Sequence, residues 1–272
     1  MFTPARPKTH IGGGLSLLER MYYATVRAIR SGHQNAVVAL AQNIVQALVI
    51  LLMFYLMFQI LGQRHSPLRG NFMLYILSGI FLYMTHVKTV TAISGAEGAT
   101  SAMMQHAPMN TAIAIVSAAL STLYIQFLTI LVILFVYHVA FSPIEIEDPV
   151  GAFGMLLLAW AYGVGVGMVF MSLKPWFPKF TMIARTIYTR ANMIASGKMF
   201  VANALSYGML KMFDWNPLFH AIDQSRGFVF MNYFPRFSSI SYAVYVTLVL
   251  LAFGLMAEFF TRKHVSLSWH RR

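Results

Sequence analysis

The sequence predicts an all-α integral membrane protein, and three observations support this fold class. Hydrophobic residues make up 58% of the 272 residues and charged residues only 10%, whereas a soluble domain carries about 25% charged residues. Lys and Arg outnumber Asp and Glu by 20 to 8, which is typical of membrane proteins with basic inner loops. Apolar segments of spanning length recur along the chain. Together these observations indicate a single transmembrane permease domain over residues 1–272.

Six segments are long and apolar enough to cross a membrane, because a spanning helix needs about 20 such residues. They cover residues 36–61, 71–87, 111–138, 150–173, 180–202 and 241–260, so the six-span bundle extends over 36–260. The loop 139–149 holds three acidic residues and no Lys or Arg, which suits the outer side. The basic tails 1–35 and 261–272 are therefore both expected in the cytoplasm.

Residues 15–31 precede the first span and predict an amphipathic helix. Basic residues such as Arg20 and Arg27 alternate with Leu18, Tyr22 and other apolar residues at helical spacing. A helix of this kind lies in the interface of the inner leaflet. The alternative is a segment that only supplies basic residues beside the first span. No cleavable signal peptide is expected, because no apolar segment precedes the first span.

The inner loop 88–110 is small and polar, and it is too long for a tight turn. Its middle can form a short helix that ends near a proline. We expect a soluble partner to contact this helix through Ser94, Gly95, Glu97 and Gly98. The alternative is a passive loop.

The outer segment 203–240 contains two apolar stretches of helical length that are too short to span. The two stretches cover 205–213 and 218–230. Trp215, Asn216 and Pro217 separate them. Such backbone is tolerated at membrane depth only when it is buried in protein or lines water. We therefore interpret the two stretches as re-entrant helices that partly plug the outer mouth.

One face of the fifth expected span is polar. Thr181, Arg185, Tyr188, Asn192 and Ser196 are three or four residues apart, so they fall within an arc of about 80° on a helix. We call this set the polar stripe. Polar side chains inside a membrane are expensive and mark functional sites, so the stripe should line water or a polar substrate. Arg185 could instead extend to the inner interface.

Other polar residues of the spans allow two interpretations. Arg190 falls on the opposite side from the polar stripe, so it must meet another protein element unless the helix is kinked. In the first span, Gln42 and Gln46 share one face and Asn43 lies beside them. Amides often join membrane helices by hydrogen bonds, so helix contact is favoured there over substrate contact.

The chemistry of an enzyme is missing from the chain. There is no cysteine, HExxH, Gly-x-Ser-x-Gly or pair of intramembrane acids, and nine scattered histidines lack metal-ligand spacing. Two of these, His86 and His138, are expected near span ends. No P-loop is present, so we expect no cofactor on this chain and ATP hydrolysis on a partner. The bases form no dense exposed run, which argues against nucleic-acid binding.

Several of these features occur together in one known family. Arg30-Ser31-Gly32 ends the basic helix, and the fifth span carries Arg185, Tyr188 and Ser196-Gly197. The string Trp215-Asn216-Pro217-Leu218-Phe219-His220-Ala221-Ile222-Asp223, followed by Arg226, precedes the last span. With six spans and an inner helix, nearly the whole chain resembles the type-2 ABC-exporter permeases. It is most similar to those that export capsular polysaccharide or O-antigen in Gram-negative bacteria.

The resemblance implies a homodimer in the bacterial inner membrane with two copies of a separate ATPase, which binds ATP and Mg. It implies a channel at the dimer interface, lined by the first and fifth spans, and an inner coupling helix seated in the ATPase. It also implies paired gate helices over 199–235. Their outer-gate residues would be Trp215, Asn216, Pro217, His220, Asp223 and Arg226. A lipid-linked, anionic glycan would be the substrate, with periplasmic export proteins and membrane lipids as further partners.

Other functions stay open at this point. A type-2 exporter of a drug or lipid shares the architecture. A membrane-embedded transferase would act without an ATPase, and the missing acid and base groups argue against it. A structural scaffold would not explain the polar stripe.

Overall fold

The computed structural model describes residues 10–31, 36–60, 71–96 and 110–264, and these ranges contain helices and no β-strand. The long helices are α1 (His10–Ser31), α2 (Ala36–Ile60), α3 (Phe72–Gly95), α4 (Thr111–Ala140), α5 (Pro149–Leu173), α6 (Pro178–Ala195) and α9 (Ile240–Lys263). A 3-10 turn (Ala202–Ala204), α7 (Tyr207–Phe213) and α8 (Pro217–Val229) lie between α6 and α9. The expected all-α fold is confirmed for the described part of the chain.

Five helices are long and apolar enough to cross a membrane: α2, α3, α4, α5 and α9. They correspond to five of the six expected spans. The fifth expected span corresponds to α6, which has 18 residues and carries Lys179, Arg185 and Arg190. With these three cations, α6 is less apolar than the five candidate spans. The six-span layout therefore stays a prediction.

The expected end of the second span at residue 87 was wrong, because α3 continues to Gly95. Lys88 and Ser94 belong to this helix and not to a loop. Polar residues fit here because the Thr85 and Thr89 hydroxyls donate to the carbonyls of residues 81 and 85, at 2.8 and 2.7 Å. His86, expected near a span end, therefore lies in the middle of α3. The rest of the expected coupling helix, including Glu97 and Gly98, lies outside the described residues.

α3 and α5 form the centre of the bundle and pack against each other along their length. Residues with almost no exposed surface include Tyr75, Ile80 and Val90 of α3 and Ala159 of α5. The candidate span of α3 is 78% buried, whereas that of α2 is 6% buried and that of α9 17%. The single chain thus leaves the apolar faces of α2 and α9 uncovered, as suits contact with lipid or a second copy.

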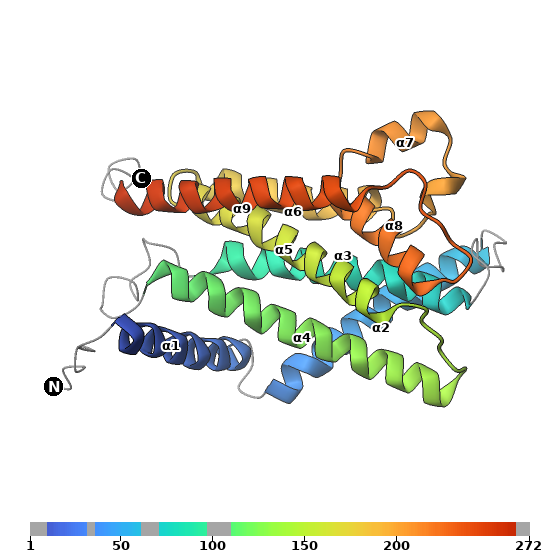
Figure 1. Ribbon diagram of the computed structural model, residues 1–272, viewed down its shortest axis with the longest axis horizontal. Coiled ribbons are helices and arrows are strands. Elements are labelled where there is room, and N and C mark those ends of the chain that lie inside the picture. Colours follow the sequence, from blue (N-terminus) through green and yellow to red (C-terminus); the bar gives the residue numbers. More distant parts are fainter. Residues whose placement is uncertain (1–9, 32–35, 61–70, 97–109, 265–272) are drawn as a thin grey trace.

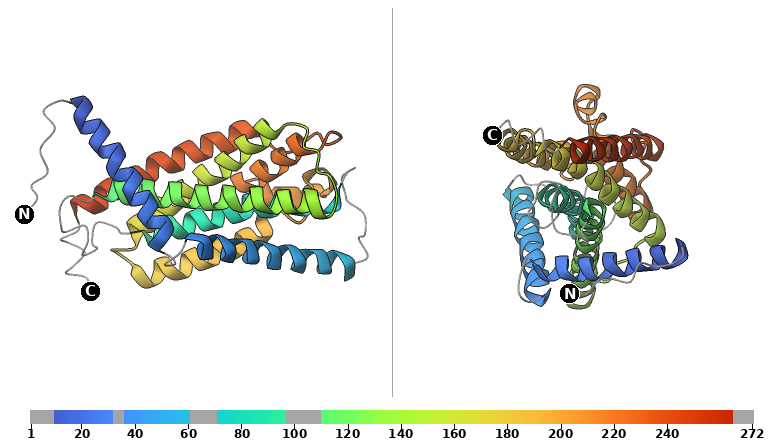
Figure 2. Two further views of the ribbon diagram at one scale, coloured as in Figure 1. Left: turned by 90° about the horizontal axis from the view of Figure 1, so that it is seen from below. Right: turned by 90° about the vertical axis from the view of Figure 1, so that its left-hand side faces the viewer.

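The two ends of the bundle differ. The C-terminal end of α9 and the start of α1 lie at one end, and α7 and α8 lie at the other (Figure 1). In keeping with the expected topology we call these the inner and the outer end. α1 crosses the inner end steeply and packs against α4 (Figure 2). Its Leu18, Tyr22 and Tyr23 are exposed, which suits the expected interfacial helix.

The outer segment contains two short helices, α7 and α8, which overlap the two apolar stretches. That these helices re-enter the membrane stays a prediction. The chain that follows α6 contacts α3 at Gly79, which lies on the inner side of the outer end of α3. A Cβ atom on Gly79 would lie 2.9 Å from the Cα atom of Lys198. Gly79 is about 10 Å along α3 from its first residue, at 1.5 Å per residue. The backbone after α6 therefore starts deep within the bundle, as a re-entrant segment requires.

Candidate substrate path and outer closure

The polar stripe of α6 faces the protomer's own helices. At its inner end, Arg185 Nη1 donates to Ser94 Oγ of α3 at 3.0 Å. The Thr181 hydroxyl is buried and donates to the carbonyl of Phe177 at 2.8 Å. The expected polar face thus exists, and in this conformation its inner part joins α6 to α3.

The middle of the stripe meets a buried histidine that sequence reasoning missed. The Tyr188 hydroxyl lies 2.9 Å from His86 Nε2 and 3.2 Å from the Tyr162 hydroxyl of α5. His86 Nδ1 lies 3.2 Å from the carbonyl of Ala159. A carbonyl only accepts, so Nδ1 carries the proton, and in a neutral ring Nε2 accepts from Tyr188. Extending the predicted helix beyond residue 87 would have placed His86 inside a span and so marked it as a buried polar residue.

The outer part of the stripe is joined to the expected gate. Asn216 Nδ2 donates to Asn192 Oδ1 and to the carbonyl of Ala195, both at 2.9 Å. Asn216 Oδ1 also accepts from the amide of Leu218 at 3.1 Å and so caps α8. Ser196, the last residue of the stripe, is fully buried. Asn192, expected in the channel, and Asn216, expected in the outer gate, are therefore hydrogen-bonded to each other.

A basic pocket of about 360 Å³ lies at the inner end of α6. Its polar lining comes from Ser94, Gly95, Lys174, Lys179, Thr181 and Arg185. Three of these side chains are cationic, and both lysines are exposed. The pocket joins two expected sites, because Ser94 and Gly95 were assigned to the ATPase contact and Thr181 and Arg185 to the channel. Its charge suits a carboxylate or phosphate group.

The amides of α2 divide between helix contact and open surface. Gln126 Nε2 of α4 donates to Asn43 Oδ1 at 3.1 Å, as expected for amides that join membrane helices. Lys88 Nζ of α3 donates to Gln46 Oε1. Gln42 and Gln46 are both exposed and line a shallow hollow along α2. Substrate contact, the alternative for Gln42 and Gln46, is therefore not blocked by other described residues of the protomer.

Arg226, expected at the outer gate, is fully buried and binds backbone. Its Nη1 donates to the carbonyls of Gly197 and Phe200, at 3.0 and 2.6 Å, and its Nη2 to that of Lys198 at 2.7 Å. The guanidinium carbon lies 4.4 Å from the centre of the Tyr75 ring. Gly197 has a φ of 72°, which favours glycine at the end of a helix. Arg226 thus fixes the turn that follows α6.

Asp223 and His220 tie α8 to the segment before α9. The Tyr233 hydroxyl donates to Asp223 Oδ1, and the Ser238 hydroxyl donates to Oδ2 at 2.7 Å. The Ser239 amide donates to His220 Nδ1 at 3.2 Å, so His220 Nε2 donates to the Asp214 carbonyl at 2.6 Å. Burial lowers the pKa of His220, which favours the neutral ring that these two bonds need.

The remaining gate residues have different surroundings. Trp215 is exposed and donates from Nε1 to the carbonyl of Met212 at 2.7 Å. Pro217 is buried in the first turn of α8, where its missing N–H costs no helical bond. Most of the expected gate set therefore holds the outer end together, and Trp215 alone of these six presents its side chain outward.

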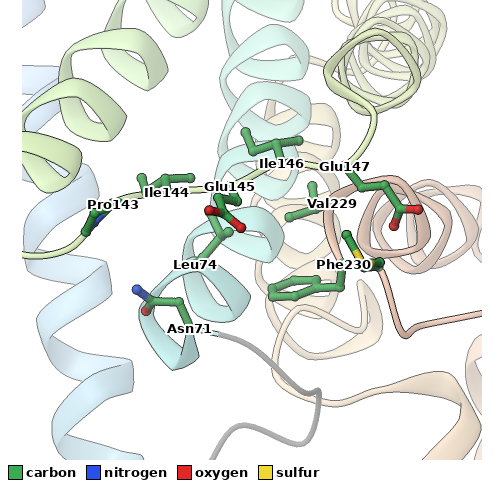
Figure 3. Close-up of a pocket in the computed structure, with 10 residues that line it drawn as sticks. Asn71, Leu74, Pro143, Ile144, Glu145, Ile146, Glu147, Val229 and Phe230 are labelled. Carbon is green, nitrogen blue, oxygen red and sulfur yellow. The ribbon is translucent and has the colours of Figure 1, made fainter.

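A second pocket, of about 370 Å³, lies at the outer end beside the loop between α4 and α5. Figure 3 shows Glu145 beside Leu74 of α3, with Val229 of α8 to one side and Glu147 farther along the loop. The loop is fastened to α8, because the amide of Asp148 donates to the carbonyl of Phe228 at 2.8 Å. The acidic charge of the outer end is therefore separate from the basic pocket at the inner end.

Comparison with known proteins agrees with the family resemblance. No family model matches the chain. Two polysialic acid transport proteins of Escherichia coli, both named KpsM, are 24% identical to it over 202 residues. The matched region covers 73% of this chain and 76% of each relative. The chain is a distant relative of the capsular polysaccharide export permeases. This relationship supports a transport permease and not an enzyme.

Proposed function

We propose that the chain is the membrane subunit of an ABC exporter that moves an acidic, lipid-linked polysaccharide outward across the bacterial inner membrane. The similarity to the KpsM proteins over 202 residues carries this proposal. Two copies of the chain would form the channel, and two copies of a separate ATPase would drive it. Both termini would face the cytoplasm.

The charge distribution supports an anionic substrate. The basic pocket presents Lys174, Lys179 and Arg185 at the inner end, where a substrate made in the cytoplasm would enter. Arg185 offers a planar pair of donors that matches a carboxylate or a phosphate. A lipid tail would lie against Phe180 and Met182, exposed apolar residues at the inner end of α6, while the charged head occupies the pocket. We call the contacts of α8 with the end of α6, with residues 197–200 and with residues 233–239 the outer closure. This closure would have to open for the polymer to leave.

The position of Ser94 and Gly95 supports a link between the pocket and the ATPase. These residues end α3, border the pocket and are the first two of the four residues expected to contact the ATPase. Arg185 bonds to Ser94. A movement of the segment after Gly95 would therefore change the pocket directly.

Removal of the chain from its own cells tests the proposal. Cells without the chain should lose surface polysaccharide and accumulate it inside, and the full chain should restore export. A tagged chain purified from membranes should bring an ATPase subunit with it in equal amount. Normal surface polysaccharide combined with lost resistance to apolar compounds would instead favour a drug exporter. Glycosyl transfer by the chain without an ATPase would favour a transferase.

A further inference from the structure

The face of α6 opposite the polar stripe is exposed and carries one cation. Its apolar members are Ile183, Ile187, Met193 and Ile194. Arg190 lies among them, one turn from Ile187 and one turn from Ile194, and it is exposed. Within the described part of the chain, no hydrogen bond or ring contact from another residue holds the Arg190 side chain.

Contacts of its neighbours place Arg190 at the middle of the bundle. Three residues of α6 and the turn after it meet α3 in order: Arg185 meets Ser94, Tyr188 meets His86, and Lys198 meets Gly79. Arg190 therefore lies close to the level of His86. α3 runs from Phe72 to Gly95, so the level of His86 is about 14 Å from its inner end and about 21 Å from its outer end. Both distances exceed the reach of an arginine side chain, and extension to an interface does not account for Arg190.

An arginine at this depth is costly against lipid, and such residues generally face a water-filled cavity or another protein element. α2 and α6 lie along one side of the bundle with α3 between them (Figure 2). We call this the open side. None of these three helices contains Asp or Glu. The cations of the open side include Lys88 on α3, which binds Gln46 of α2.

From this placement we propose that Arg190 lines the aqueous channel at mid-membrane depth and binds the carboxylate or phosphate groups of the passing polymer. The inference rests on the proposed function and adds a substrate contact on the face of α6 away from the polar stripe. In the conformation described, the stripe is engaged by α3, α5 and α8, and of the two arginines of α6 only Arg190 has a guanidinium without a hydrogen-bond partner among the described residues. Because α2, α3 and α6 contain no acidic residue, none of these helices neutralises the charge of Arg190, and the guanidinium can attract an anionic ligand.

Thiol labelling tests the location without reference to export. Because the chain has no cysteine, single-cysteine variants need no background substitutions. The full exporter in membrane vesicles would be treated with a water-soluble thiol reagent. Arg190→Cys should react, whereas Leu248→Cys, an exposed apolar position on α9, should not. A cysteine at position 190 that is as unreactive as the one at 248 would overturn the channel location.

The charge of the site is tested with Ile187→Cys, one turn away on the same face. A negatively charged thiol reagent should react faster than a positively charged one of equal size. Adding Arg190→Gln should lower this ratio about tenfold, and Arg190→Lys should keep it. An unchanged ratio would contradict an anion site at Arg190, whatever the cargo of the exporter is.

Export supplies the final measurement. Arg190→Gln should slow surface delivery of an acidic polysaccharide about tenfold, as for one lost charge-assisted contact, and Arg190→Lys should retain most delivery. Arg236→Gln, which removes an exposed charge at the outer end, is the matched control. Full export by Arg190→Gln would overturn the substrate contact. No polysaccharide export by the unaltered chain would reject the proposed function, and the two labelling results would still decide whether position 190 is an anionic-ligand site in water.

Discussion

The two ends of α6 use positive charge in opposite ways. At the outer end, Arg226 is buried against three backbone carbonyls, and Lys198 Nζ lies 3.4 Å from the centre of the Tyr83 ring. At the inner end, Lys174 and Lys179 are exposed around an open pocket with Arg185. The same residue types therefore hold the fold together at one end and are available to a ligand at the other. Burial and partners, and not residue type, distinguish the two roles.

The largest effect should come from Arg226. Arg226→Ala removes three donors and leaves buried carbonyls without partners, so we expect a loss of about 3 kcal/mol in the free energy of unfolding. Denaturant unfolding in detergent would measure it. Arg236→Ala, an exposed cation at the same end, should change the value by less than about 0.5 kcal/mol. Equal losses of unfolding free energy in the two variants would contradict the structural role of Arg226.

The next effect concerns whether the outer closure moves. The side chains of Asn192 and Asn216 are hydrogen-bonded to each other, so in the double variant Asn192→Cys with Asn216→Cys a short bifunctional methanethiosulfonate reagent should cross-link the two thiols. If the closure must separate from α6 during transport, cross-linking should stop export and a reductant, which cleaves the cross-link, should restore it. Each single variant treated with the same reagent is the control. Full export with the cross-link demonstrably formed would mean that α6 and α8 stay together throughout transport.

A smaller effect is expected at the inner pocket. Arg185→Ala should lower export about tenfold, because one charge-assisted contact is lost. Arg185→Lys should also be impaired if the planar fork binds substrate, and nearly silent if only a long cation is needed. Surface polysaccharide at matched membrane levels would measure both. Unimpaired export by Arg185→Ala would exclude Arg185 from substrate binding.

The smallest effect on stability should be at Gly95, where a Cβ atom would meet nothing within 4 Å. We expect Gly95→Trp to change the free energy of unfolding by less than about 0.5 kcal/mol. Because Gly95 borders the pocket and belongs to the expected ATPase contact, the substitution should still lower the polysaccharide exported per ATP hydrolysed. Gly208→Trp, an equally open position on α7, should leave that ratio unchanged. A normal ratio in Gly95→Trp would reject the coupling role.

Much of the helix layout could be predicted from the sequence, because apolar length and helical period are local properties. The end of α3 could not be located, since Thr89, Thr91 and Ser94 suggest a polar loop until the bonds of their hydroxyls to helix carbonyls are known. The polar stripe on α6 was predicted as a face, yet periodicity does not identify what the face meets. Its contacts with Ser94, His86 and Asn216 depend on residues far away in the sequence.

The gate prediction shows the same limit. Residues 215–226 could be singled out as a motif, but the carbonyls that Arg226 binds come from residues 197–200, and their position depends on the close approach at Gly79. From the sequence, Arg190 was expected to meet another protein element unless the helix is kinked, and no partner for it is found among the described residues of this protomer. Its mid-bundle level became clear only from the contacts of α6 with α3.

The burial of α3 has a mechanical consequence. A helix that is packed on most sides over 24 residues cannot bend locally without opening cavities in the core, which are costly. We therefore expect a force applied at Gly95 to move α3 as one rigid helix and not to bend it. Near the outer end of α3, the Tyr75 ring packs on the guanidinium of Arg226, and Gly79 lies against the backbone of Lys198. A displacement of α3 that begins at the inner surface would therefore act directly on the residues around Arg226.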